Sequence, residues 1–115
     1  MSETKLLREI QLACSRGDAR LWRNNVGRTQ DIVPPHRWIH YGLCVGSSDL
    51  IGLSSVIITS HDVGRRLAVF AAVEVKSQRG RATREQQSFI DTVSSLGGLA
   101  GIARSVEQAR TILTL

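Results

Sequence analysis

The chain has 115 residues, 42% of them hydrophobic and only 4% aromatic, which fits one compact domain with a modest, mainly aliphatic core. Fifteen Lys and Arg against ten Asp and Glu give a net charge of +5, which favours a polyanionic partner, although many small basic proteins are merely soluble. No run approaches the roughly 20 apolar residues of a membrane span, and the two cysteines lack zinc-ligand spacing, so we expect a reduced, cytoplasmic protein.

The first part of the chain predicts a helix, a strand and a loop. Ser2 precedes an amphipathic pattern that we expect to form a helix ending near Gly17, with its apolar positions at Leu6, Leu7, Ile10 and Ala13. Residues 19–24 alternate well enough for a strand. Residues 26–40 have weak periodicity and contain the Pro34-Pro35 pair, which favours a loop.

The middle of the chain predicts two strands joined by a turn. The first begins at Asp49, after Gly46-Ser47-Ser48, and strand-like residues continue to Thr59. Residues 61–66 are typical of a hairpin turn. The nearly continuous apolar run 67–76 then favours a central strand covered on both faces.

The last part predicts two capped helices around a strand. After a polar loop at 77–81, Thr83 is an expected N-cap with Gln86 in capping-box position, and Gly97-Gly98 ends that helix. Residues 99–103 form a short strand, and Ser105 caps the final helix. This order indicates one α/β domain over residues 1–115, with helices on a central mixed sheet.

The chemistry of the sequence is concentrated at Asp49, Glu74 and Lys76. Glu74 and Lys76 lie two residues apart, on the same side of the apolar strand. If that strand pairs antiparallel with the one that begins at Asp49, the two carboxylates lie at the same sheet edge. They would then share a hard divalent cation with the backbone carbonyl of Val75, while Lys76 contacts the attacking water or the scissile phosphate.

Each of these residues also has an ordinary interpretation. An Asp after Gly-Ser-Ser is usually a turn or cap residue. A Glu-x-Lys at a strand end is usually a surface ion pair worth at most about 1 kcal/mol. The combination of both patterns is what favours a phosphodiester-cleaving site.

Four stretches in order carry a resemblance to a known family. Asp49 with Glu74-Val75-Lys76 resembles the PD-(D/E)XK nuclease signature, and the chain more narrowly resembles a stand-alone virus-type replication-repair nuclease (VRR-NUC) domain of the kind found in phages and bacteria. The stretches are Glu3 with the first helix, Trp22 to Gly27, Gly46 to Gly52, and Val73 to Phe89. Two departures are Ser48, where the family has Pro, and Thr83-Arg84, where it has Ser-Pro.

The resemblance implies a restriction-endonuclease-like αβββαβ core, a mechanism and a metal. Mg²⁺ or Mn²⁺ would be bound by Asp49, Glu74 and the Val75 carbonyl. Glu3, with Glu9 as the fallback, would orient the attacking water, although Glu3 is also a favourable charge at a helix N-terminus. Gln86 would position Lys76 or the phosphate, or else serve only the capping box.

Several residues outside this set are candidates for DNA contact. Arg23 and Asn24 near the first strand's end, and Arg79 and Arg81 in the following loop, are expected at phosphates or on the plain surface. Trp22 and Trp38 would stack on bases or pack, and packing is favoured. The three histidines lack ligand spacing, so surface or substrate contacts are favoured over metal binding.

These patterns lead to the hypothesis of a metal-dependent, structure-specific DNA endonuclease active in DNA repair. The family resemblance implies branched or four-way (Holliday) junctions, and a homodimer would present two identical sites. The segment 26–40 would supply the dimer interface or DNA contacts. A non-catalytic nucleic-acid-binding module on the same fold and a small structural protein remain alternatives, as do RNA as substrate, exonuclease action, and one metal or two.

Overall fold

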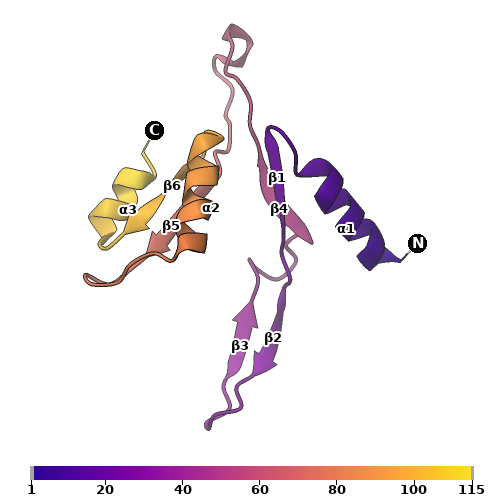
Figure 1. Ribbon diagram of the computed structural model, residues 1–115, viewed down its shortest axis with the longest axis vertical. Coiled ribbons are helices and arrows are strands. Elements are labelled where there is room, and N and C mark those ends of the chain that lie inside the picture. Colours follow the sequence, from indigo (N-terminus) through magenta and orange to yellow (C-terminus); the bar gives the residue numbers. More distant parts are fainter. Residues whose placement is uncertain (1, 115) are drawn as a thin grey trace. The chain divides into compact units, whose positions relative to one another are not determined.

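The computed structural model describes residues 2–114, which form two compact units, one ending at Ser54 and the other beginning at Ser55 (Figure 1). Both units combine helix and strand, so the expected mixed α/β class is confirmed. The strands pair as three two-stranded sheets, β1-β4, β2-β3 and β5-β6. The expectation of one central mixed sheet is therefore not met within residues 2–114, and none of the helices there is long and apolar enough to cross a membrane.

The first unit is built on α1 and the antiparallel pair β1-β4. Helix α1 (Glu3–Cys14) begins where the Ser2 side chain accepts a hydrogen bond from the Lys5 N–H at 3.1 Å. Strand β1 (Ala19–Arg23) pairs with β4 (Leu50–Ser54), from Ala19 opposite Ser54 to Arg23 opposite Leu50. Glycine is required at position 52, because a Cβ there would overlap the Arg20 carbonyl of the paired strand.

Residues 26–40 are not a loop but contain most of a β-hairpin. Strand β2 (Gly27–Gln30) pairs antiparallel with β3 (Trp38–Tyr41). The tip is closed by hydrogen bonds from Asp31 N–H to the Arg37 carbonyl (2.8 Å) and from His36 N–H to the Val33 carbonyl (2.9 Å). The loop prediction was wrong because these four-residue strands are exposed, so neither shows the apolar alternation that marks a half-buried strand.

The second unit is a β-α-β arrangement followed by a helix. Strand β5 (Ala71–Val75) pairs in parallel with β6 (Leu99–Ala103), and α2 (Arg84–Ser95) connects them. Helix α3 (Val106–Ile112) begins after its cap, Ser105, and packs on β6. The most buried side chains of residues 2–114 all lie in this unit, and they are Val93 (0% exposed), Ala103 (2%) and Ile90 (8%).

The predicted strand pairing around the candidate site differs from the pairing observed. Only residues 50–54 and 71–75 are strands in the segments expected to form a hairpin, and they pair with β1 and β6 respectively. The expected hairpin turn at 61–66 overlaps the 3₁₀ helix η1 (Ser60–Asp62) and includes a turn in which the Arg65 N–H donates to the Asp62 carbonyl at 2.9 Å, but it joins no pair of strands. Val75 is 76% exposed, so β5 is not covered on both faces at its end. Apolar composition identifies strand-forming residues, but it does not specify the strand with which they pair.

Candidate active site

Three of the predicted catalytic residues meet at the end of β5. The Gln86 side-chain amide donates to Oε1 of Glu74 at 3.0 Å, and Nζ of Lys76 lies 3.5 Å from the same oxygen. The Glu74 and Lys76 side chains are 32% and 19% exposed. The cluster is therefore open enough for a substrate but sheltered enough to hold its side chains in place.

Gln86 serves the expected capping box and also contacts Glu74, rather than Lys76 as the sequence suggested. Its Oε1 accepts a hydrogen bond from the Thr83 N–H at 2.9 Å, and the Thr83 hydroxyl accepts one from the Gln86 N–H at 3.1 Å, which completes a capping box. Because the amide oxygen faces Thr83, its NH₂ group faces Glu74. The helix cap thus orients the group that holds the carboxylate.

The other oxygen of the Glu74 carboxylate remains available for a ligand. Both contacts fall on Oε1, and no hydrogen bond or ion pair from residues 2–114 reaches Oε2. An ionised carboxylate with one oxygen held and one open, followed by the carbonyl of Val75, is a donor set suited to a hard divalent cation. These residues therefore fit the Mg²⁺ or Mn²⁺ that the resemblance implies.

Arg104, which the sequence did not single out for this role, holds the loop that follows Lys76. Its Nη1 donates to the carbonyls of Ser77 and Gly80, the latter at 2.7 Å. The Lys76 N–H donates to the Ala103 carbonyl at 3.1 Å, which ties the end of β5 to the residue before Arg104. The sequence feature that could have indicated this role is the position of Arg104, a basic residue directly after the strand that pairs with β5.

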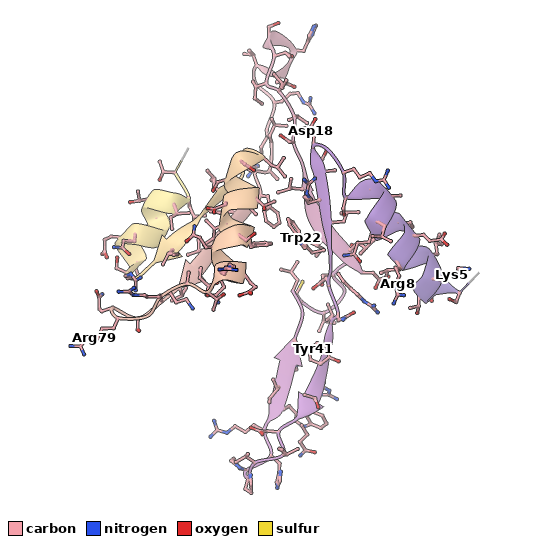
Figure 2. The ribbon with its side chains drawn as sticks, viewed as in Figure 1. Lys5, Arg8, Asp18, Trp22, Tyr41 and Arg79 are labelled. Atoms are coloured by element: carbon pink, nitrogen blue, oxygen red, sulfur yellow. The ribbon has the colours of Figure 1, made fainter. Side chains whose placement is uncertain are left out.

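Two predicted DNA contacts lie on or beside this anchored loop. Arg79 and Arg81 are exposed, and Figure 2 shows the Arg79 side chain pointing away from the loop. Neither makes an ion pair within residues 2–114, so both guanidinium groups are free to meet phosphates.

Asp49 lies in the first unit, directly before β4. Its backbone carbonyl accepts a hydrogen bond from the Asn24 N–H at 2.8 Å, while no described residue bonds to its carboxylate. Asp49 and Glu3 line the same cavity of about 630 Å³, together with Arg23 and six further residues from α1 and from residues 48–50. Glu3 lines this cavity and Glu9 does not, which favours Glu3 as the first-helix acid, although its role stays a prediction.

Asn24 fixes the loop that leads to Asp49. Its side-chain NH₂ donates to the Ser47 hydroxyl (2.7 Å) and to the Ser48 carbonyl (2.9 Å), and its oxygen accepts from the Leu43 N–H (2.9 Å). The amide was expected at DNA, but it is already engaged within the chain. Arg23, the other predicted contact on this strand, is exposed, and its Nε donates to Asn25 at 2.8 Å.

The candidate residues thus form two groups, one in each unit. Glu3 and Asp49 belong to the first, and Glu74, Val75, Lys76 and Gln86 to the second. Within residues 2–114, no three acidic, His or Cys side chains gather at metal-binding distance. A cation shared by Asp49 and Glu74 therefore stays a prediction.

Comparison with known proteins identifies the family. The family model of the VRR-NUC domain matches residues 3–107, a range that begins at Glu3 and includes every candidate residue. The chain belongs to the VRR-NUC family. No curated protein and no solved structure matches it. Membership in the VRR-NUC family implies a nuclease-type function with DNA as the substrate.

Proposed function

We propose that this VRR-NUC protein is a Mg²⁺- or Mn²⁺-dependent, structure-specific DNA endonuclease. The observation that supports the proposal most is the Glu74 carboxylate, held on one oxygen by Gln86 and Lys76 and open on the other. A surface ion pair alone would not need a capped helix to orient a third side chain onto the carboxylate. A metal site must present one carboxylate oxygen in a fixed direction, and a third side chain that holds the carboxylate serves that need.

The residues have distinct roles in this proposal. Asp49, Glu74 and the Val75 carbonyl would hold the divalent cation, which would supply charge neutralisation at the phosphate and a water of lowered pKa. Lys76 contacts the attacking water or the scissile phosphate, and Glu3 orients that water. Gln86 acts as a positioning residue through Glu74.

Exposed basic residues complete the proposed DNA surface. Arg23 beside Asp49, and Arg79 and Arg81 close to Lys76 in the following loop, neutralise phosphates of the bound DNA. Asn24 is reassigned from DNA contact to the positioning of Asp49, because its amide is engaged by residues 43–48.

Branched DNA and a homodimer belong to the same proposal. A small catalytic domain has little surface for reading base sequence in addition to its chemistry, which favours recognition of DNA shape. Twofold symmetry would present two identical sites to matching strands of a junction. Sedimentation equilibrium tests the dimer directly, and a monomer at all concentrations would reject that part alone.

Cleavage of labelled DNA tests the activity. The substrates are a four-way junction, a flap and a linear duplex, each with Mg²⁺, Mn²⁺ or EDTA. We expect Asp49→Asn, Glu74→Gln and Lys76→Ala each to reduce cleavage by about 100-fold or more. Two matched controls, Asp91→Asn on the exposed side of α2 and Lys5→Ala on α1, should cut as the wild type does.

Two results would reject the proposal of a metal-dependent endonuclease that uses these residues. Cleavage that persists in EDTA, or in all three site variants, would show that the activity does not come from these residues. Tight, salt-dependent binding without cutting in either metal would instead support a non-catalytic nucleic-acid-binding module.

A further inference from the structure

The β2-β3 hairpin has two faces of different chemistry. Residues directly opposite in an antiparallel pair point to the same side of the ribbon. Arg28 is opposite His40 and Gln30 is opposite Trp38, so these four side chains share one face. The Arg28 guanidinium lies 4.6 Å from the centre of the Trp38 ring, which agrees with that assignment.

The other face of the same ribbon carries Thr29, Ile39 and Tyr41. Thr29 is opposite Ile39, and Gly27 is opposite Tyr41. The Tyr41 ring lies across Gly27, where an added Cβ would come within 2.6 Å of the ring carbon Cζ. Ile39 is 47% exposed, close to the 55% of Trp38, so the two faces can be compared side chain for side chain.

Trp38 is an exposed aromatic ring beside a positive charge. Packing was the favoured expectation for this residue and is wrong, since more than half of the side chain is exposed. The only acid of residues 27–41, Asp31, uses its carboxylate to accept the Val33 N–H at 3.0 Å, within the hairpin tip. The cation of Arg28 is therefore not neutralised by an ion pair within the described residues.

This face continues to Asp49. A cavity of about 590 Å³ is lined by Arg28 and His40 from the hairpin and by Asn24 and Asp49 from the loops at its base, with five further residues of the same unit. A DNA strand with its scissile phosphate at Asp49 would have its neighbouring nucleotides beside Arg28 and His40. Trp38 lies one step farther along the same face.

We propose that the Arg28, Trp38 and His40 face binds unpaired nucleotides next to the scissile phosphate. One base stacks on Trp38, while Arg28 and His40 contact the adjacent phosphates. The base must be unpaired, because a base inside a duplex presents no open ring surface to an indole. This inference rests on the proposed nuclease function, and it narrows the substrate to branched DNA with unpaired nucleotides beside the cut.

Binding measurements on the full chain test the proposal. Fluorescence anisotropy in EDTA, which prevents metal-dependent cutting, compares a duplex carrying a single-stranded overhang with a blunt duplex of the same duplex length. We expect Trp38→Ala to weaken binding of the overhang DNA by about 5- to 100-fold, as for one lost base–aromatic stack. Binding of the blunt duplex should change by less than about twofold, and Trp38→Phe should retain most of the affinity for the overhang.

Ile39→Ala is the matched control, because Ile39 has similar exposure on the opposite face of the same ribbon. Equal losses for Trp38→Ala and Ile39→Ala would overturn the proposal by showing an effect on the hairpin's folding. So would no loss, an equal loss on both DNAs, or no binding of either DNA by the wild type. A Trp38→Ala protein that fails to dimerise when the wild type does would also overturn it, since the face would then contact a second copy.

Cleavage in Mg²⁺ or Mn²⁺ separates this inference from the proposed function. Cleavage by the wild type without Trp38-dependent binding rejects the hairpin inference alone. Trp38-dependent binding without any cleavage rejects the nuclease proposal and leaves the hairpin as a single-strand binding surface.

Discussion

The Gln86 amide connects the Thr83 cap of α2 to the Glu74 carboxylate of β5, with hydrogen bonds of 2.9 Å on one side and 3.0 Å on the other. The position of the carboxylate is therefore coupled to the start of a helix. Because Lys76 contacts the same carboxylate oxygen, a disturbance at the helix cap reaches two of the proposed catalytic groups.

Substitutions at Gln86 should separate the cap from the positioning of Glu74. Gln86→Glu retains a side chain that serves a capping box, but it sets a second carboxylate against Glu74. Apart from this repulsion, we expect the free energy of unfolding at neutral pH to stay within about 0.5 kcal/mol of the wild-type value. We expect the cleavage rate to fall by about 10-fold or more.

Thr83→Ala is the converse variant. It should destabilise the protein by about 1 kcal/mol through the lost cap and lower the cleavage rate less than Gln86→Glu does. Thermal denaturation and single-turnover cleavage of both variants check the pair. Equal rates in Gln86→Glu and the wild type would contradict a positioning role for Gln86.

Asn24→Ala should release the loop before Asp49. The variant loses three side-chain hydrogen bonds, to Leu43, Ser47 and Ser48, so we expect a loss of about 1–3 kcal/mol in stability and a lower cleavage rate. Its neighbour provides the control, because the Asn25 side chain only accepts from exposed Arg23. Asn25→Ala should leave both quantities nearly unchanged. Chemical denaturation and cleavage assays measure the two effects. An equal response of the two variants would argue against a role of the Asn24 side chain in holding the loop before Asp49.

Arg104→Lys should loosen the loop after Lys76 while keeping the charge. A lysine side chain is shorter than an arginine side chain, so its ammonium group does not reproduce the contacts of Nη1 with the Ser77 and Gly80 carbonyls. We therefore expect faster tryptic cleavage after Arg79 and Arg81, identified by mass spectrometry, and a reduced nuclease rate. Arg110→Lys on the exposed side of α3 is the control. Unchanged proteolysis of the loop in Arg104→Lys would show that other contacts hold it.

Asp62 should titrate below the ordinary pKa of an aspartate. The Thr59 backbone N–H, which donates to the carboxylate at 3.0 Å, is the main cause of the lowered pKa, and desolvation opposes it in part. The Arg65 guanidinium, at 2.9 Å, lowers this pKa further. Since the folded pKa is the lower one, the stabilisation of η1 is present above the ordinary pKa of 3.8 and is lost as the pH falls through the folded value.

Carboxyl-detected NMR titration measures the Asp62 pKa directly. Arg65→Gln should raise it toward the ordinary value without reaching it, because the Thr59 contact remains. An Asp62 pKa at or above the ordinary value in the wild type would contradict the capping geometry of η1.

The sequence by itself determined the family and the helix caps, and it singled out the candidate site residues. Ser2, Thr83 and Ser105 begin helices as predicted, because an N-cap is a local contact between residues a few positions apart. Likewise, Glu74 in β5 and Lys76 directly after it lie on one side, 3.5 Å apart, because the strand period is two. The VRR-NUC family model matches residues 3–107 of the same sequence.

Tertiary structure alone decided how these segments pair and what each side chain contacts. The pairing of β4 with β1 and of β5 with β6, the hairpin at 27–41, and the exposure of Trp38 involve partners distant in sequence, which local pattern does not encode. The roles of Asn24 and Arg104 have the same origin, since each side chain bonds to a loop about 20 or more residues away. Gln86 combines both kinds of contact. Its capping box is local and could be predicted from the sequence, whereas its hydrogen bond to Glu74 exists only because α2 packs against β5.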